Sequence, residues 1–412
     1  MKDEKKAPKL RFKGFTDDWE QCKLKNKAEI VRGASPRPIS NPKWFDDNSN
    51  VGWLRISDVT EQKGRIHHLS QHISKAGQSK TRVITDPHLL LSIAATVGSP
   101  VINYVNTGVH DGFLIFLNPT FNKEFMFQWL LMFKPYWNKY GQPGSQVNLN
   151  SDIVGNQSVA FPTTSEQERI ANFFSELDTA ITLHEEKKHQ LERLKSALLQ
   201  KMFADKSGYP AVRFKKYNSA WVLRRIIDLL NQAITDGPHE TPCLVGKGIP
   251  FISADAIVNN KIDFSRKRGN ITKEYDLECC KKYRPQMHDI YLVKSGSTVG
   301  KVAIVETTTR FNIWSPLAAL RCGEKSDPYF VFFLMQTEKF QTQVKNKASN
   351  GTQPNLSMRA LERFKVIVSI ELNEQQAIGN LFKKMNELID LYQHKIDNLI
   401  AVKQWLLQNM FI

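Results

Sequence analysis

The sequence contains an internal duplication, and this feature limits the possible folds more than any other. Residues 8–19, PKLRFKGFTDDW, return as residues 210–221, PAVRFKKYNSAW, at a shift of 202 positions. Three later pairs of stretches follow in the same order, with a shift that rises to 208: GSQVNLN (144–150) with GTQPNLS (351–357), SEQERIANFF (165–174) with NEQQAIGNLF (373–382), and LLQKMF (198–203) with LLQNMF (406–411). A repeat of this length is domain-sized rather than a solenoid unit, so the sequence predicts two related halves.

Each half begins with about 155 residues of mixed pattern. Short β-branched and aromatic runs, broken by Gly, Pro and Asn, predict strands. Longer apolar patches at 125–133 and 329–340 predict helices. The strand runs are 92–97, 113–117, 249–253, 290–293 and 302–305. We therefore predict α+β globular domains at 1–160 and 207–367, and the sequence leaves their topology open.

Each half ends in a long helical pattern, predicted at 161–206 and 368–412. No Pro or Gly occurs from residue 165 to 203, and a helix of that length would extend for about 57 Å. Apolar residues recur at heptad spacing on one face of each helix. These seam residues are Leu177, Ile181, Leu191, Leu198 and Met202 in the first helix, and Met385, Ile389, Ile396, Leu399, Leu406 and Met410 in the second. The pattern predicts that the helices pair as a coiled coil, and packing on the preceding domain is the alternative.

The chain is strongly basic, which favours a polyanionic partner. Its formal net charge is +16, with 28 basic and 22 acidic residues in 1–206 and 29 and 19 in 207–412. An excess of this size indicates nucleic acid as the leading candidate. The sequence has no apolar run long enough to span a bilayer and no apolar segment behind its charged N-terminus. The sequence has five cysteines, an odd number, and none of them form a C-x-x-C pair. This fits a reducing, cytoplasmic location.

Signatures of catalysis and metal binding are missing from the sequence. The stretch VKSGSTVGK (293–301) lacks the spacing of a phosphate-binding loop. Residues 41–44 and 118–121 lack the second proline of an amino-methyltransferase loop, and no glycine-rich loop for S-adenosylmethionine is evident. His67, His68 and His72 have no Cys or carboxylate set beside them. We therefore expect no catalytic residues and no metal site on this chain.

Turn-rich loops with hydrogen-bonding and basic side chains are the best candidates for a DNA-binding surface. Such side chains read base edges, while Arg and Lys hold phosphates. The stretches are VRGASPRP (31–38) and SIAATVGSP (92–100) in the first half, and ITDGPHETP (234–242), RKR (266–268) and VKSGSTVGK in the second. The candidate residues are Arg32, Ser35, Arg37, Ser92, Thr96, His239, Thr241, Arg266, Lys267, Arg268, Lys294, Ser295 and Lys301.

This layout resembles the specificity subunit of Type I DNA restriction–modification systems. The marks are the duplicated stretches quoted above, together with ITDGPHETP and VKSGSTVGKVAIV, which look like parts of that family's target-recognition domains. The resemblance implies a non-catalytic reader of double-stranded DNA. Its two target-recognition domains would read the halves of an asymmetric bipartite site, joined by an antiparallel coiled coil. The first half replaces the Asp-Gly-Pro-His loop with Gly33-Ala34-Ser35-Pro36, so contacts are not carried over there.

The resemblance also implies partners and cofactors. Two modification subunits, which are adenine methyltransferases, and restriction subunits with translocase and nuclease activity would assemble on this chain. S-adenosylmethionine, ATP and Mg would be bound by those partners and not by this chain. Two other classes stay open at this point: a stand-alone DNA methyltransferase or nuclease with cryptic motifs, and a coiled-coil scaffold with incidental charge.

Overall fold

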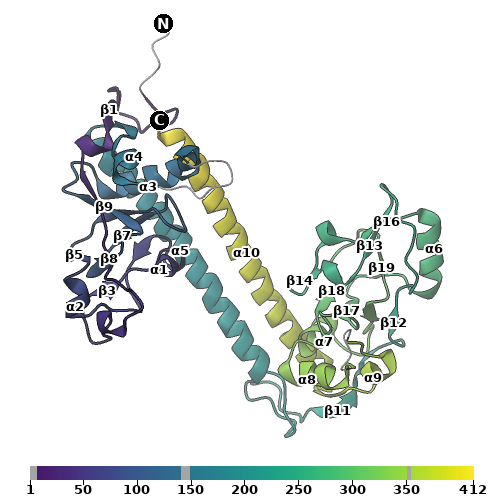
Figure 1. The fold of residues 1–412 in the computed structure, drawn as a ribbon. Helices are drawn as coiled ribbons and strands as arrows, with labels where there is room; N and C mark the ends of the chain where they lie inside the picture. Colours follow the sequence, from purple (N-terminus) through teal and green to yellow (C-terminus); the bar gives the residue numbers. More distant parts are fainter. Residues whose placement is uncertain (1–6, 141–148, 350–353) are drawn as a thin grey trace. The chain divides into compact units, whose positions relative to one another are not determined.

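The computed structural model describes residues 7–140, 149–349 and 354–412 (Figure 1). Residues 144–148 of the GSQVNLN stretch and residues 351–353 of the GTQPNLS stretch lie outside these ranges. The chain divides into two compact units, Met1–Glu185 with His394–Ile412, and Glu186–Gln393. Each unit therefore contains one globular part and segments of both long helices.

The first unit is built on a five-stranded sheet in the order β2-β9-β6-β7-β4. Its middle strands are almost wholly apolar, so the sheet is covered on both faces. A three-stranded sheet, β3-β8-β5, and the pair β1-β10 complete the β structure. The strands are β1 (Glu20–Lys23), β2 (Glu29–Arg32), β3 (Gly52–Trp53), β4 (Arg65–Ile66), β5 (Arg82–Ile84), β6 (Leu89–Ser92), β7 (Pro100–Asn103), β8 (Thr107–Val109), β9 (Phe113–Leu117) and β10 (Ser158–Phe161). The helices are α1 (Ile56–Glu61), α2 (Lys75–Gln78), α3 (Lys123–Phe133), α4 (Ser151–Gly155) and α5 (Thr164–Lys201).

The second unit repeats this plan with sheets β12-β20-β17-β18 and β16-β13-β19, and with pairs β11-β21 and β14-β15. The strands are β11 (Val222–Arg225), β12 (Thr235–Asp236), β13 (Ile249–Ile252), β14 (Ile257–Val258), β15 (Lys261–Ile262), β16 (Gly269–Ile271), β17 (Ile290–Val293), β18 (Val302–Ile304), β19 (Asn312–Ile313), β20 (Leu317–Leu320) and β21 (Lys365–Val368). The helices are α6 (Lys273–Lys282), α7 (Pro328–Leu334), α8 (Glu338–Lys347), α9 (Met358–Glu362) and α10 (Leu372–Met410).

The predicted elements agree with this fold with two exceptions. The run at 92–97 is not a strand, because β6 ends at Ser92 and the chain turns through Ala95 (φ 55°) and Gly98 (φ 78°). The patch at 329–340 is two helices, since α7 ends at Leu334 and the Thr337 side chain caps the start of α8. Both errors come from apolar runs that a local turn divides.

The two long helices run antiparallel within each unit. In the first unit Asp178 of α5 forms an ion pair of 2.5 Å with Lys403 of α10, and the rings of Phe174 and Phe411 lie 5.9 Å apart. In the second unit the rings of Phe203 and Phe382 lie 6.1 Å apart. The structure thus has the α+β globular parts and the antiparallel helix pairing expected of the chain. All eleven predicted seam residues are buried or half-buried.

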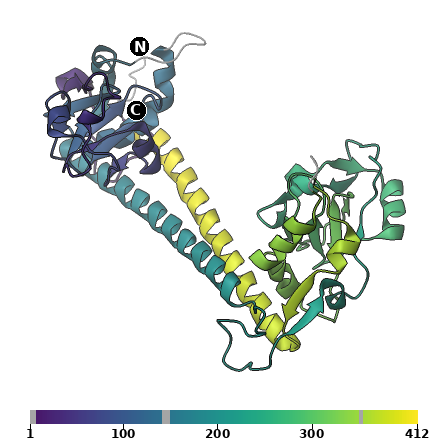
Figure 2. The same cartoon turned by 60° about the horizontal axis from the view of Figure 1, so that its bottom comes forward.

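Each globular core is completed by the end of the other copy's helix. Leu406, Leu407, Met410 and Phe411 of the C-terminal stretch belong to the core of the first unit. Met202 and Phe203, with the partly buried Leu198 and Leu199, belong to the core of the second. Figure 2 shows the end of α10 against the first globular part. The repeated LLQKMF and LLQNMF stretches are therefore two equivalent core-filling segments.

Candidate nucleic-acid interface

The candidate site in the first unit is a loop that follows β2 and lies tightly against the turn between β8 and β9. A Cβ atom on Gly33 would come within 2.1 Å of the His110 carbonyl oxygen, so only glycine permits this approach. The Ser35 hydroxyl donates to Asp111 Oδ1 at 2.7 Å, and Arg37 Nη2 donates to Asp111 Oδ2 at 2.9 Å. Arg32 Nε donates to the Asp111 carbonyl at 2.6 Å. Asp111 therefore organises the loop.

The charge state of the loop follows from these contacts. The Ser35 hydrogen bond, and then the guanidinium groups of Arg32 and Arg37, hold the pKa of Asp111 below its usual range. Burial lowers the pKa of His110 despite the nearby Asp111 carboxylate. At neutral pH the loop consequently presents an ionised carboxylate beside a neutral imidazole.

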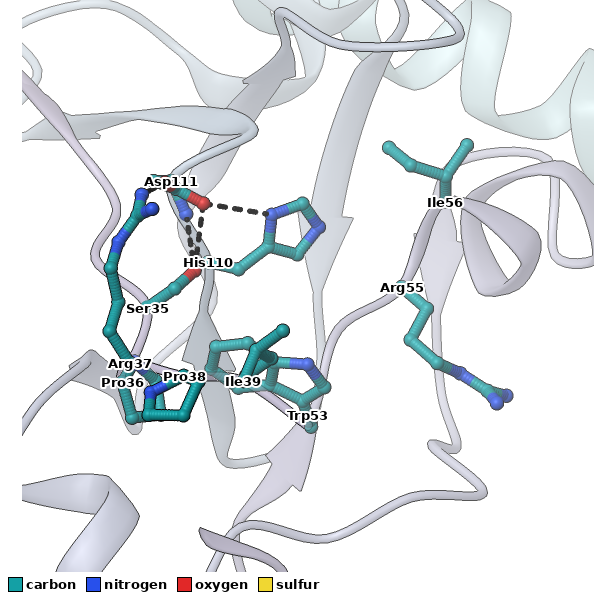
Figure 3. A pocket seen from close by; sticks show the side chains of 10 residues that line it. All are labelled: Ser35, Pro36, Arg37, Pro38, Ile39, Trp53, Arg55, Ile56, His110 and Asp111. Carbon is teal, nitrogen blue, oxygen red and sulfur yellow. Dashed lines mark hydrogen bonds and ion pairs between the residues drawn. The ribbon is translucent and has the colours of Figure 1, made fainter. Parts of the chain in front are cut away.

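A cavity of about 430 Å³ opens beside this loop. In Figure 3, Ser35 and Asp111 lie on one side and Arg55 and Ile56 on the other, with His110 and Trp53 between them. The cavity thus combines apolar and aromatic walls with a few converging charged groups, as small ligand-binding sites do.

The equivalent loop of the second unit follows β12 and is built in the same way. A Cβ atom on Gly237 would come within 1.9 Å of the Ile313 carbonyl oxygen. The His239 ring lies between two groups, with Nδ1 3.2 Å from Ser315 Oγ and Nε2 3.1 Å from Asp236 Oδ2. Trp314 Nε1 donates to the Glu240 carbonyl at 3.2 Å. The second loop is thus held in place by neighbouring side chains.

Lysines hold Asp236 in its ionised form beneath this loop. Burial alone would raise the pKa of Asp236, but the ammonium groups of Lys282 and Lys294 lower it. The Lys294 ammonium lies 3.3 Å from Asp236, and its side chain is only 10% exposed. This lysine is therefore placed to support the loop from below.

The other predicted residues differ in how far their side chains are exposed to solvent. Ser92 is buried and donates to the Ala94 carbonyl, so it stabilises a turn. Arg268 lies over the Trp314 ring at 4.2 Å, beside the second loop. Arg32, Arg37, His239, Thr241, Arg266, Lys267, Arg268 and Lys301 are exposed, while Ser35, Thr96 and Ser295 are half-buried.

The sequence reasoning missed Trp53, His110, Asp111, Trp314 and Ser315. Each follows or lies within a very short strand, and no local pattern distinguishes it from ordinary loop residues. The one available signal was that HDGF (110–113) and WSPL (314–317) lead into equivalent strands, β9 and β20, of the two halves.

Neither a metal site nor a membrane span is found in the described part of the chain. Among those residues, no group of three or more His, Cys, Asp or Glu side chains could hold a metal ion. No helix within the described ranges is long and apolar enough to cross a bilayer.

Fold and site together define a class: a basic, duplicated protein that presents two similarly built loops and carries paired long helices. The family profile described as "Type I restriction modification DNA specificity domain" matches residues 16–193 and 201–401. The chain belongs to this family. It is accordingly a DNA-recognition subunit of the Type I restriction–modification kind, and not a catalytic subunit.

Individual relatives match most of the chain. Two curated proteins of Methanocaldococcus jannaschii are similar. The putative type I restriction enzyme MjaX specificity subunit is 20% identical, covering 97% of this chain and 94% of the relative. The type I restriction enzyme MjaIX specificity subunit is 19% identical, covering 85% and 83%.

Solved structures show the same fold. The S subunit of a Type I restriction–modification system from M. genitalium superposes with a TM-score of 0.61 at 13% identity, covering 98% of this chain and 99% of that one. A chain from a study of complex assembly in the type I R-M system gives a TM-score of 0.55 at 14% identity, covering 95% and 97%.

Proposed function

We propose that this subunit reads an asymmetric, bipartite DNA site, one half with the loop after β2 and the other with the loop after β12. The observation that carries the proposal is that the two loops share one backbone frame but differ in side chains. Ser35, Arg37 and Asp111 form the first, and His239, Thr241 and Ser315 form the second. Different side chains on the same frame would select different base pairs, because base edges are distinguished by donor and acceptor pattern.

Exposed basic residues around these loops would hold the DNA backbone. Arg32 and Arg37 flank the first loop, while Arg266, Lys267 and Lys301 are exposed in the second unit. Each phosphate neutralised steepens the fall of log K with log salt by about 0.9. We therefore expect strongly salt-dependent binding.

We further propose that the long helices dock two modification subunits. Large apolar side chains are exposed on both helices, and grouped exposed apolar side chains mark protein-binding surfaces. Leu183 is 62% exposed and Trp405 is 56% exposed in the first unit, and Leu194 is 51% exposed in the second. The positions of Leu183 and Leu194 recur 208 residues later as Leu391 and Val402, both also exposed. A duplicated surface fits two copies of one partner.

Restriction subunits would join this assembly. S-adenosylmethionine would then be held by the modification subunits, and ATP and Mg by the restriction subunits. Because the substrate is the cell's own and incoming DNA, we place the complex in the cytoplasm.

Methylome sequencing with and without this gene tests DNA reading. We expect a split adenine-methylation motif to disappear with the gene and to return with the wild-type chain. The purified subunit without its partners should not methylate DNA. Methylation by the isolated chain, or a motif that survives deletion, would contradict the proposal.

Docking is tested separately by the number of modification subunits bound. The double variant Leu183→Ser and Val402→Ser should bind one copy where the wild type binds two, as should Leu194→Ser with Leu391→Ser. Thr182→Ser, an exposed substitution on the same helix, is the control. Native mass spectrometry gives the stoichiometry, and two copies on both double variants would show that these side chains do not form the docking surfaces.

A further inference from the structure

The strand registers establish which positions of the two loops are equivalent. Arg32 of β2 pairs with Leu114 of β9, and Asp236 of β12 pairs with Ala318 of β20, so both strands shift by 204 residues. The same shift relates Gly33 to Gly237, the two glycines that approach a neighbouring carbonyl. It also relates Ser35 to His239, and Asp111 to Ser315.

The side chains at these two positions contact each other in both units. In the first unit the contact joins Ser35 Oγ and Asp111 Oδ1 at 2.7 Å. In the second it joins His239 Nδ1 and Ser315 Oγ at 3.2 Å. The frame thus brings the same two positions together twice, with a hydroxyl and a carboxylate in one unit and an imidazole and a hydroxyl in the other. The chemistry of this contact therefore differs between two copies of one scaffold, as expected if each copy meets a different ligand group.

The surroundings of Asp111 favour a ligand with hydrogen-bond donors. Its side chain is 34% exposed and borders the cavity beside Trp53 and His110. Ser35 and Arg37 each use one oxygen, and a carboxylate has about four acceptor positions, so acceptor capacity is left. A carboxylate repels phosphate groups, whereas it accepts hydrogen bonds from the exocyclic amino groups of bases.

We propose that these two pairs are the specificity-determining residues of the subunit. Asp111, positioned by Ser35, accepts a hydrogen bond from the exocyclic amino group of a cytosine or an adenine in the first half-site. His239 and Ser315 occupy the equivalent place in the second half-site, where the neighbouring Asp236 carboxylate is buried beneath His239 and is not exposed to a base. This inference rests on the proposed function, since it names the residues through which the same DNA site is read.

The test uses the full chain assembled with its modification subunits and a DNA library in which every position of the bipartite site is varied. Asp111→Asn keeps the size of the side chain but replaces an acceptor oxygen by an amino donor. We expect the relative methylation of base pairs at one position of one half-site to change by about 5- to 150-fold, the range for one good base contact. The other half-site should be unchanged.

Three further variants make the result specific. Ser35→Ala removes only the hydroxyl that positions Asp111 and should weaken the same base preference. This variant provides the test if Asp111→Asn folds poorly. His239→Ala should alter only the other half-site. Asp47→Asn removes an exposed carboxylate of the first unit outside the cavity and should leave both preferences as in the wild type.

The outcomes separate the inference from the function on which it rests. A wild-type complex that methylates no bipartite site would refute the proposed function. A wild type with a bipartite site, together with Asp111→Asn and Ser35→Ala variants of unchanged base preference, would refute the inference alone. A fall in methylation rate that is equal for all DNA sequences would likewise overturn the inference. It would show that Ser35 and Asp111 only stabilise the loop.

Discussion

At the scale of single residues, the repeated stretches at the start of the long helices have a structural explanation. Glu166 is fully buried and accepts two hydrogen bonds of 2.7 Å from Arg11, and Glu374 accepts bonds of 2.6 and 2.8 Å from Arg213. The sequence predicted that these stretches matter because they recur. It could not show why, since each pair joins residues about 155 to 161 positions apart.

Replacing the buried carboxylates should destabilise the chain. Glu166→Gln removes the buried carboxylate that pairs with the Arg11 guanidinium, which costs about 3 kcal/mol of unfolding free energy. Glu374→Gln should cost more, because Glu374 also accepts from Trp221 Nε1 at 3.0 Å and from Ser369 Oγ at 2.5 Å. Urea denaturation measures the loss. The exposed Glu168→Gln should stay within about 0.5 kcal/mol of the wild type, and equal stability of all three variants would contradict this reading.

Two lysines of the second unit should behave differently although the sequence predicts both as DNA contacts. Lys301 is exposed, so Lys301→Ala should weaken binding about equally for all sequences and lower the salt slope by about 1. Lys294 is paired with the buried Asp236, so Lys294→Ala should also loosen the loop at His239. Binding titrations at several salt concentrations, with hydrogen exchange of the loop, separate the two effects. A change of base preference in Lys301→Ala would be evidence against a phosphate contact.

At the scale of elements, the long helices were predictable because the helical period is a local pattern. The packing of their ends into the globular cores was not predictable. The long helical segment predicted at 161–206 contains α5 at Thr164–Lys201. That the end of α10 fills the core of the first unit depends on packing between segments about 200 residues or more apart, which no local pattern records. The small sheets were equally hard to predict, because strands of two or three residues, such as β3 and β12, leave almost no alternation to detect.

Removing one ring from a helix end should therefore destabilise the other copy's globular part. Phe411 is buried, with its ring 5.3 Å from Phe125 and 5.9 Å from Phe174. Phe411→Ala should cost about 3–5 kcal/mol in the first unit. The equivalent Phe203→Ala should act on the second unit. Hydrogen exchange followed by mass spectrometry locates the loss.

The control for this experiment is Trp405→Ala, which removes a large ring that is 56% exposed on the same helix. It should leave protection in the first unit unchanged. If Phe411→Ala loosened the second unit and spared the first, the assignment of the helix end to the first core would be wrong.

At the scale of the whole molecule, the duplication means that one half contains most of what it needs to pair with a copy of itself. In a chain cut after Lys206, the first core lacks the Leu406–Phe411 stretch that fills it. The fragment still carries LLQKMF at 198–203, the equivalent stretch. The end of α5 from a second copy can supply the missing apolar groups. Lys195 lies 208 positions before Lys403, so it can likewise replace the partner of Asp178.

We therefore expect residues 1–206 to form a two-fold dimer that reads an inverted repeat, since protein symmetry is mirrored in the target. Dimerisation should require higher protein concentration than the linked chain does, because the covalent link supplies a local concentration of about millimolar order. His184 and Lys188 would take the seam places of Tyr392 and Ile396, so the helix pairing should be weaker. Sedimentation of the fragment, followed by methylation mapping with the modification subunit present, tests both points. The same fragment with Phe203→Ala should dimerise poorly, since it removes the ring that replaces Phe411. A well-folded monomer, or a dimer that still marks the asymmetric parent site, would contradict the two-fold arrangement.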